Sequence, residues 1–387
     1  MDKTIGIACN ISTGKLDANQ AVPGGEYPFF TCAGYPDQID HFAYDDDVVL
    51  VAGNNARGNF HVSRYKGKFN AYQRTYILTA KEGFNIDYVY YALKLELKRL
   101  REKSQGSQTK FLTMPILTGI HFRDITGDEQ TEIANVLNAI DKKMELNNRI
   151  NAELEVMAKS LFDHWFVQFD FPDDSPQGQG NPYKTSGGKM VYNSTLKREI
   201  PQGWSDKTLS QIANITMGQS PEGSSYNDEG VGTIFYQGST DFGWLFPTTR
   251  QYTTAPSRMA KKGDILLSVR APVGDMNIAN TDCCIGRGLA ALNSKTHSDG
   301  FLFYVMKYFK QIFDRRNSEG TTFGSITKND LYSLTLAYPT SDLLKKYDEI
   351  VTNYNKMIFE RSLENQELAS LRDWLLPMLM NGQVTVK

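Results

Sequence analysis

The sequence lacks the features that usually mark membrane, secreted and nucleotide-binding proteins. It contains no run of roughly 20 apolar residues, so no membrane-spanning helix is expected. The start, Met1-Asp2-Lys3-Thr4, has neither the basic nor the apolar region of a signal peptide, which favours a cytoplasmic location. Neither a Gly-x-x-x-x-Gly-Lys-Ser/Thr loop nor a Gly-x-Gly-x-x-Gly loop after a strand occurs. No phosphate-binding loop is therefore indicated.

Cysteine and histidine are too scattered to suggest a metal site. Cys9, Cys32, Cys283 and Cys284 form no Cys-x-x-Cys pair, and adjacent residues of a strand point to opposite faces. We expect buried apolar cysteines rather than a disulfide or a zinc site. The five histidines show no spacing typical of metal ligands or of a nucleophile and its base. Catalysis by this chain is therefore not expected.

The chain also lacks the basic excess of a strong non-specific DNA binder. Its 42 basic and 44 acidic residues give a net charge of −2, so any contact with DNA must come from where the charges lie. A length of 387 residues with 40% hydrophobic and 22% charged residues predicts two or more globular domains.

The sequence repeats itself, and internal repeats bear directly on domain organisation. Late in each copy the matches keep one offset, 320 − 106 = 214, over about fifty residues, which argues against chance. The matching segments are Asp2–Gly14 with Asp206–Gly218, Gly106–Leu117 with Gly320–Leu331, and Asn151–Leu154 with Asn365–Leu368. The chain is therefore predicted to use one unit twice.

Each copy is predicted to be a mixed α/β module of about 130 residues followed by a long helix. The predicted organisation is a module at 1–126, a helix at 127–169, a linker at 170–204, a module at 205–340 and a helix at 341–387. Strands are predicted at Val48–Ala52, Thr75–Thr79, Asp264–Val269 and Leu289–Leu292, and helices at Asp87–Arg101 and Phe301–Arg316. The linker is rich in Pro, Gly and polar residues and is expected to have little core of its own.

Both long helices carry apolar residues at three- and four-residue steps, the pattern of a coiled-coil seam. The seam is assigned to Ile133, Ile140, Asn147, Leu154, Leu161, Tyr354, Arg361, Leu368 and Leu375, with Met157, Met357 and Leu371 also on it. Asn147 and Arg361 correspond in the repeat, and polar seam residues fix register at some cost in stability. Our hypothesis is an antiparallel coiled coil with pseudo-twofold symmetry. The alternative is that each helix lies on its own module.

Basic residues gather where acidic residues are missing. Val48–Lys81 contains no Asp or Glu and interleaves Arg and Lys with Asn, Gln and aromatic residues, and Phe242–Gly263 repeats this. Such residues suit phosphates and base edges. The candidate DNA contacts are Asn54, Asn55, Arg57, Arg64, Lys66, Lys68, Gln73, Arg74, Gln219, Arg250, Arg258, Arg270 and Arg287. The alternative is a solvated basic face without a ligand.

Four groups of residues resemble the specificity subunits of Type I restriction-modification enzymes, and the resemblance covers essentially the whole chain. The groups are Asn10–Asp17 with Tyr27–Phe30; Glu129-Gln130, Ile140-Asp141, Asn151 and Leu161–Phe166; Gly187–Val191 with Arg198–Trp204; and Gly263–Gly274 with Ile285–Ala290.

The resemblance implies two target recognition domains, each reading half of a split double-stranded DNA target through the major groove, with the helices setting the gap. It further implies two modification subunits that methylate adenine with S-adenosylmethionine, and restriction subunits that use ATP and Mg²⁺. No cofactor is expected on this chain. Two other interpretations are a DNA-reading methyltransferase-type enzyme and a coiled-coil scaffold that does not bind DNA. Asn181-Pro182-Tyr183 lacks one Pro of the Asn-Pro-Pro-Tyr motif, which disfavours the enzyme.

Overall fold

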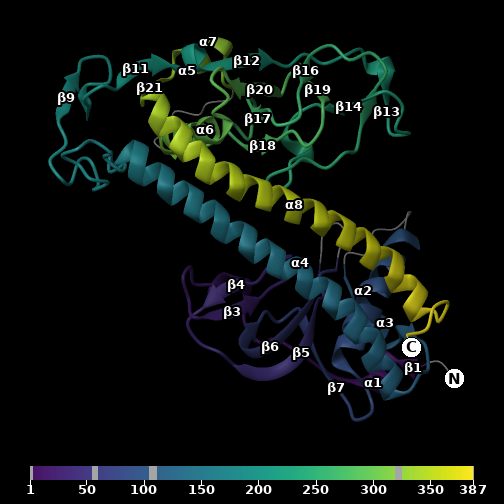
Figure 1. Cartoon of the computed structure of the whole chain (residues 1–387). Helices are drawn as coiled ribbons and strands as arrows, with labels where there is room; N and C mark the ends of the chain where they lie inside the picture. Colours follow the sequence, from purple (N-terminus) through teal and green to yellow (C-terminus); the bar gives the residue numbers. More distant parts are fainter. Residues whose placement is uncertain (1–2, 55–59, 104–110, 319–324, 387) are drawn as a thin grey trace. The chain divides into compact units, whose positions relative to one another are not determined.

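The chain folds into two compact units, and each long helix contributes to both. The computed structural model describes residues 3–54, 60–103, 111–318 and 325–386. Unit 1 comprises residues 1–147 and 363–387, and unit 2 comprises residues 148–362. The long helices are α4 (Gly127–Phe162) and α8 (Ser341–Met380), labelled in Figure 1.

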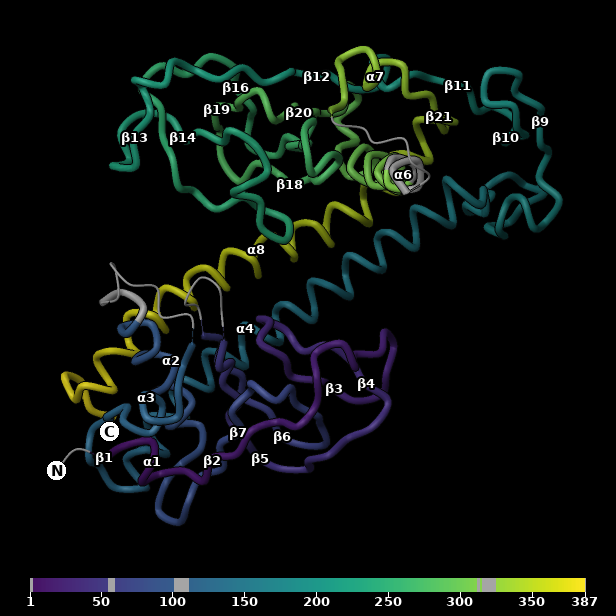
Figure 2. Tube along the Cα trace, turned by 180° about the vertical axis from the view of Figure 1, so that it is seen from behind, coloured from purple at the N-terminus to yellow at the C-terminus, as the bar shows by residue number. Residues whose placement is uncertain are grey.

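Unit 1 is built on a six-stranded sheet with strand order β2-β7-β5-β6-β3-β4. Its pairs are antiparallel except β3 with β6. Before α4 the elements are β1 (Lys3–Thr4), α1 (Ile5–Ala8), β2 (Cys9–Thr13), β3 (Tyr27–Phe30), β4 (Asp37–Ile39), β5 (Tyr44–Ala52), β6 (Val62–Ala71), β7 (Thr75–Ala80), α2 (Ile86–Lys103), α3 (Met114–Thr118) and β8 (His121–Phe122). Short helices α1 and α3 lie next to each other (Figures 1 and 2).

Unit 2 repeats this plan around a four-stranded sheet, β12-β20-β17-β18, and a five-stranded sheet, β13-β15-β14-β19-β16. Its elements between α4 and α8 are β9 (Met190–Asn193), β10 (Arg198–Pro201), β11 (Ser205–Thr208), α5 (Leu209–Ile212), β12 (Ala213–Met217), β13 (Tyr226–Asn227), β14 (Thr233–Tyr236), β15 (Tyr252–Thr253), β16 (Met259–Ala260), β17 (Ile265–Ser268), β18 (Met276–Ile278), β19 (Cys283–Ile285), β20 (Leu289–Ser294), α6 (Asp299–Ser318), α7 (Lys328–Ser333) and β21 (Thr335–Tyr338). The strands and helices predicted from the sequence are confirmed, with ends that differ by a few residues.

Individual backbone hydrogen bonds within unit 1 have equivalents within unit 2. The predicted internal repeat is therefore also a repeat of structure. In each unit a strand precedes a one-turn helix and pairs with a strand from the end of the module, and another strand follows the helix. The corresponding N–H to carbonyl bonds are Ile5 to Ile120 (3.0 Å) with Leu209 to Leu334 (2.7 Å), Lys81 to Ala8 (2.8 Å) with Lys295 to Ile212 (2.9 Å), and Gly14 to Thr75 (3.1 Å) with Gly218 to Leu289 (2.9 Å).

The central strands are apolar runs because both of their faces are buried. In β5, Val49 and Val51 pack towards α2, whereas Val48 and Leu50 belong to a smaller cluster on the opposite face. Alternation of side chains along a strand makes a doubly covered strand continuously apolar. This explains why the run at Val48–Ala52 stands out in the sequence.

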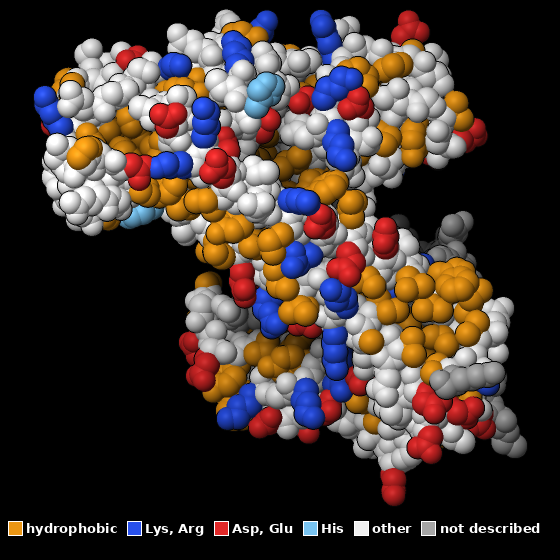
Figure 3. Space-filling view, viewed as in Figure 1, with side chains coloured by type: hydrophobic (Ala, Val, Ile, Leu, Met, Phe, Trp, Pro, Cys, Tyr) orange, Lys and Arg blue, Asp and Glu red, His pale blue; other side chains and the backbone are white. Residues whose placement is uncertain are grey.

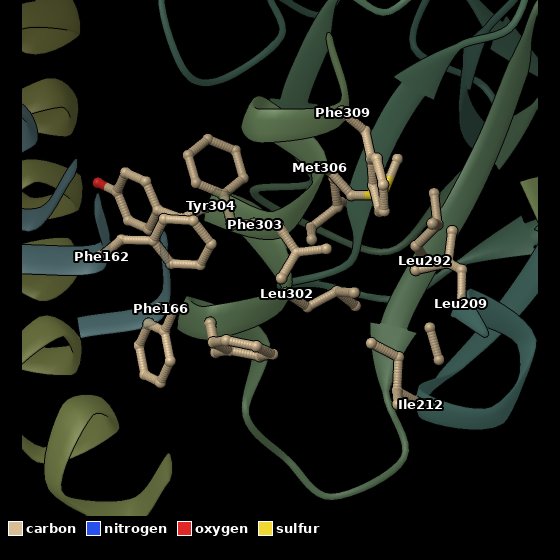
Figure 4. Packing of buried hydrophobic residues seen from close by; sticks show 14 of the residues in the cluster. Phe162, Phe166, Leu209, Ile212, Leu292, Leu302, Phe303, Tyr304, Met306 and Phe309 are labelled. Carbon is tan, nitrogen blue, oxygen red and sulfur yellow. The ribbon is translucent and has the colours of Figure 1, made fainter. Parts of the chain in front are cut away.

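The main core of unit 2 is rich in aromatic residues. Phe162, at the end of α4, packs against Tyr304 on α6 (Figure 4). Phe166 lies in the π-helical turn that follows α4. The Phe166 ring centroid lies 4.8 Å from that of Phe301 and 5.0 Å from that of Tyr347 at the start of α8. Aromatic side chains of this size bury large apolar areas, so this cluster anchors both long helices within unit 2.

The segment 170–204, expected to be a linker with little core, makes regular contacts with unit 2. Strands β9 and β10 form a hairpin, and the Phe171 ring stacks on Tyr183 and Trp204 at 4.7 and 5.4 Å. Ile200 and Trp204 belong to the main core of unit 2. The few aromatic residues of this segment order it despite its Pro- and Gly-rich composition.

The residues that the sequence assigned to a coiled-coil seam differ in how far they are buried. Ile133, Ile140, Asn147 and Leu154 are buried as expected, and Leu161, Tyr354, Arg361, Leu368 and Leu375 are half-buried. The assignment of Met157, Met357 and Leu371 to the seam is wrong, since they are 51%, 37% and 43% exposed. Their neighbours Ala158 and Ile358 are buried instead. A coiled-coil seam repeats every 3.5 residues. Around the polar positions of the helices, the predicted seam positions were therefore displaced by one residue from the buried positions.

The start of α4 carries a reciprocal pair of capping hydrogen bonds. The Thr126 backbone N–H donates to the Glu129 carboxylate at 3.0 Å, and the Glu129 N–H donates to the Thr126 hydroxyl at 3.2 Å. This reciprocal pair is a capping box, which satisfies backbone donors that a helix N-terminus leaves free. The same kind of box forms at the start of α7, between Thr327 and Asp330.

The structure also tests what the sequence suggested about the cysteines, membrane-spanning helices and metal ligands. Cys9, Cys283 and Cys284 are buried as predicted, whereas Cys32 is half-buried, and all four cysteines carry free thiols. Within the described ranges no helix is long and apolar enough to cross a membrane. Across the same residues no group of three or more His, Cys, Asp or Glu side chains is placed to hold a metal ion.

Candidate nucleic-acid interface

In unit 1 several predicted DNA contacts meet where three connections leave the sheet. The β6–β7 turn, Tyr72–Arg74, is tied to the chain after β2 by the Gln73 N–H, which donates to the Leu16 carbonyl at 2.9 Å. The chain after β5 reaches the same place, because the Gly53 N–H donates to the Arg74 carbonyl at 2.8 Å. Asn54, Gln73 and Arg74 are thus brought together, and the Arg74 guanidinium lies 5.8 Å from the Phe111 ring centroid.

In unit 2 the equivalent connections gather Gln219, Arg270 and Arg287. The Arg287 N–H donates to the Ser220 hydroxyl at 3.3 Å, and the Val269 N–H donates to the Gly288 carbonyl at 2.9 Å. Arg258 lies beside them, since its carbonyl accepts from Ile285 N–H at 2.9 Å. Gln219 and the three arginines are exposed. No described carboxylate forms an ion pair with Arg258, Arg270 or Arg287.

We call these two arrangements the turn clusters. The turn cluster of unit 1 comprises Gly14–Leu16, Asn54 and Tyr72–Arg74, and that of unit 2 comprises Gly218–Ser220, Arg258, Arg270 and Gly286–Gly288. Their backbone bonds match in pairs, so Gln73 corresponds to Arg287, and Asn54 corresponds to Arg270. Loops at one end of a rigid sheet commonly carry binding residues.

Gly14 and Gly218 make the turn clusters possible. A Cβ atom on Gly14 would collide with the carbonyls of Ala71 and Tyr72, and one on Gly218 would collide with the carbonyls of Gly286 and Leu289. Only glycine allows two backbones to approach this closely. The glycine that aligns in the two copies of the sequence repeat therefore marks the point where the turn packs on the strand end.

Arg64 is placed differently from what the sequence suggested, because carboxylates surround it. Its Nε donates to Asp87 Oδ1 at 2.6 Å, and its Nη1 atom forms an ion pair with Asp47. Burial opposes ionisation, but the bonds to Asp47 and Asp87 outweigh it and raise the pKa of Arg64. Arg64 is therefore committed to contacts inside unit 1.

Lys66 and Lys68 lie on β6, away from the turn cluster and opposite acidic residues of β5. Lys66 pairs in register with Asp47, and their charged atoms are 3.6 Å apart. Lys68 pairs in register with Asp45 and places its ammonium 4.6 Å from the Phe42 ring centroid. The positive charge of Val48–Lys81, which contains no acidic residue, is thus balanced by acidic residues of the neighbouring strand β5.

Two further candidates in the described chain are held by carboxylates. Arg250 Nε donates to Asp241 Oδ1 at 2.8 Å, which raises the pKa of Arg250, although its side chain is 62% exposed. Gln73 Nε2 donates to Asp17 Oδ1 at 2.7 Å while remaining exposed. Asn55 and Arg57, which follow Asn54, lie outside the described residues. On the face shown in Figure 3, basic and acidic side chains are interspersed within each unit.

The buried polar contacts of the long helices involve residues that the sequence analysis missed. Asn147 Nδ2 donates to Glu364 Oε2 at 2.7 Å and to Asn365 Oδ1 at 2.9 Å in unit 1. In unit 2, Asn151 Nδ2 lies 3.4 Å from the Ser362 hydroxyl. Arg361 instead donates to the Met357 carbonyl of its own helix at 3.2 Å. The repeated Asn-x-Glu-Leu at 151 and 365 was the available signal for these positions.

A family model described as the Type I restriction modification DNA specificity domain matches residues 2–156 and 201–370. The chain belongs to this family. The two matched regions coincide with the two copies of the internal repeat, so the chain carries two specificity domains. The resemblance inferred from the sequence is thereby confirmed, and the role of the family is specificity rather than catalysis.

Named relatives and a solved structure agree with this assignment. The chain is 31% identical over 332 residues to the MjaX specificity subunit of Methanocaldococcus jannaschii, named for a type I restriction enzyme, covering 83% of this chain and 70% of that one. It is 34% identical over 221 residues to the EcoDI specificity subunit of Escherichia coli, covering 54% and 48%. A crystal structure of a type I restriction-modification S subunit from M. genitalium has the same fold, with a TM-score of 0.63, 19% identity and coverage of 98% and 96%.

Proposed function

We propose that this specificity subunit reads a bipartite double-stranded DNA target, with one half-site contacted by each turn cluster. The observation that carries the proposal is the recurrence of one loop arrangement in both units, bearing Asn54, Gln73 and Arg74 in one and Gln219, Arg258, Arg270 and Arg287 in the other. Arginine recognises guanine edges, and Asn or Gln recognises adenine. Selection of bound duplexes from a random pool tests the proposal, and two half-sites separated by a fixed gap are expected.

Candidates outside the turn clusters that lie against carboxylates are not assigned to base reading. Lys66, Lys68 and Arg250 contribute at most to attraction of phosphates, because Asp47, Asp45 and Asp241 lie against them. Arg64 is left out of the interface. Asn55 and Arg57 stay predictions, since they continue the chain from Asn54.

The helices α4 and α8 are proposed to form an antiparallel coiled coil with pseudo-twofold symmetry, which sets the gap between half-sites. Contacts within each unit support this, because residue numbers rise along α4 as they fall along α8. The contacts are Asp141 with Arg372 (2.9 Å) and Asn147 with Asn365 (2.9 Å) in unit 1, and Asn151 with Ser362 (3.4 Å) and Ala158 with Tyr347 (3.2 Å) in unit 2. Asn147 takes the register-fixing role, and Arg361 does not share it.

The catalytic steps are proposed to belong to partner subunits. Two modification subunits would dock along the helices and use S-adenosylmethionine, and restriction subunits would use ATP and Mg²⁺. A cytoplasmic location is part of the same proposal, because the DNA target and these partners would be found there. The near-neutral charge of −2 is consistent with partners that supply many of the phosphate contacts.

Exposed apolar residues at equivalent helix positions support the docking of two identical partners. Met157 on α4 is 51% exposed and Leu371 on α8 is 43% exposed, and 371 − 157 is again 214. Trp374, one turn further along α8, is 57% exposed. Figure 3 shows hydrophobic side chains gathered over this part of α8. Exposed Trp beside apolar residues is typical of interface hot spots.

Charged substitutions at these two positions should change the number of bound modification subunits stepwise. Met157→Asp or Leu371→Asp alone is expected to reduce the complex from two modification subunits to one, and the double variant should bind none. Native mass spectrometry of the complex measures this number. Val191→Asp, which alters an apolar side chain that is 46% exposed on β9, is the control and should keep two. Two bound subunits in the double variant would place docking elsewhere.

A further inference from the structure

In unit 1 a continuous series of polar contacts joins the recognition sheet to helix α4. Arg64 on β6 donates from Nε to Asp87 Oδ1 on α2 at 2.6 Å. The other oxygen of Asp87, Oδ2, accepts from Asn138 Nδ2 on α4 at 3.0 Å. Arg64 also donates to the carbonyls of Val48 and Tyr65, at 3.1 and 2.9 Å, so it is bonded to the strand backbone as well.

The series continues through a buried tyrosine to helix α8. The Tyr91 hydroxyl lies 2.8 Å from Asp141 Oδ2 and 3.0 Å from Asn138 Oδ1. Asp141 Oδ1 accepts from Arg372 Nη1 on α8 at 2.9 Å. Burial and then the negative charge of Asp141 raise the pKa of Tyr91, so its hydroxyl keeps the proton at neutral pH. We name Arg64, Asp87, Tyr91, Asn138, Asp141 and Arg372 the polar joint.

The polar joint involves β6, the strand that leads into the turn cluster of unit 1, because Arg64 lies on it. Strand β6 ends at Ala71, and the next three residues are Tyr72–Arg74 of the turn cluster. Arg64 lies seven residues before the end of β6, on the same strand, and an extended strand transmits a displacement along its length. The position of Gln73 and Arg74 relative to α4 and α8 therefore depends on the contacts of Arg64.

Unit 2 holds its recognition module on the helices by different chemistry. Residues 87–94 align with 300–307, and this places Tyr304 at the position of Tyr91. The counterparts of Asp141 and Arg372 are Asn355 and Ala158, since both pairs differ by 214. Tyr304 packs on Phe162 with ring centroids 6.1 Å apart. In unit 2 the position of Tyr91 is thus taken by aromatic packing, and Lys307 on α6 forms an ion pair with Glu155 on α4.

We propose that Tyr91 and its polar-joint partners are positioning residues that fix the turn cluster of unit 1 relative to the helices and so define the accepted gap between half-sites. This inference rests on the proposed bipartite reading. Hydrogen bonds to charged groups are directional, whereas apolar packing tolerates small rotations. The hydrogen bonds of the polar joint therefore fix the direction in which the first recognition domain is held, a role that aromatic packing at Tyr304 does not fill in unit 2.

Two isosteric substitutions test the inference in the full-length chain with its modification partner. Affinity is measured on duplexes that keep both half-sites and have the selected gap or a gap changed by one or two base pairs. Tyr91→Phe is expected to reduce the preference for the selected gap by about tenfold, the size of one hydrogen bond to a charged group. Its base preference within each half-site should be unchanged. Tyr304→Phe is the matched control and should keep the wild-type gap preference.

A second pair of variants separates positioning from general loss of structure. Arg372→Gln should relax the gap preference as Tyr91→Phe does, and Arg372→Lys, which keeps a donor for Asp141, should restore it. A purely structural role predicts equal weakening on every gap, and that result would overturn the inference. So would a Tyr91→Phe variant as selective as the wild type. If the wild-type chain selects no bipartite motif at all, the proposed function itself is overturned.

Discussion

Replacing Arg270 and Arg287 together by glutamine is expected to weaken binding to the full target by about 100-fold, because each arginine that contacts a base edge or phosphate contributes about 1–3 kcal/mol. Both side chains are exposed in the turn cluster of unit 2, and no described carboxylate pairs with either. The slope of log affinity against log salt concentration should fall in magnitude by about 2. Titration of labelled duplexes at several salt concentrations measures both quantities.

Arg250→Gln is the matched control for this pair. Arg250 is an exposed arginine of the same unit, but Asp241 holds its guanidinium. Its loss should change affinity by less than about threefold, the usual range for a paired surface charge. A mutated half-site offers a second control, because the double variant should lose discrimination only at the half-site that unit 2 reads. Equal effects of Arg250→Gln and the double variant would show that overall charge, and not the turn cluster, governs binding.

Asn147→Asp is expected to destabilise the helix pair by about 3 kcal/mol, since it converts a buried donor into a buried carboxylate beside Glu364. Asn147 is only 1% exposed, and its amide donates to both Glu364 and Asn365. Chemical denaturation followed by circular dichroism measures the loss. The loss should shrink as the pH falls, because protonation of either carboxylate removes the repulsion.

Two further substitutions on α4 define what Asn147 does. Asn135→Asp makes the same chemical change at an exposed position of the helix and should cost less than about 0.5 kcal/mol. Asn147→Leu should leave stability nearly unchanged while relaxing the helix stagger, because a polar seam residue favours one register. A Leu variant with unchanged stagger and oligomeric state would remove the basis for a register role.

The features that could be predicted from the sequence are those that depend on local pattern. The strand at Val48–Ala52 follows from a continuous apolar run, and the helix at Asp87–Arg101 follows from apolar residues at helical spacing. The two copies were recognisable because the repeat keeps one offset over many residues. Gly14 and Gly218 align for a physical reason, since each lies against a carbonyl of the turn that packs on it.

The features that could not be predicted depend on residues brought together by the fold. The absence of acids from Val48 to Lys81 suggested a free basic stretch, but β5 places Asp45 and Asp47 directly opposite Lys68 and Lys66. A strand register is not visible in a charge count. The joining of Asn54 with Gln73 and Arg74 likewise depends on backbone bonds between three separate connections.

The measurement that tests the central claim most directly is selection of duplexes from a random-sequence pool by the full-length chain, with and without its modification partner, at two salt concentrations. Sequencing of the bound fraction is predicted to reveal two short conserved half-sites separated by a gap of fixed length. Mutation of the turn cluster in unit 2 should erase one half-site and leave the other. Binding without enrichment, or enrichment of a single uninterrupted motif, would contradict the account.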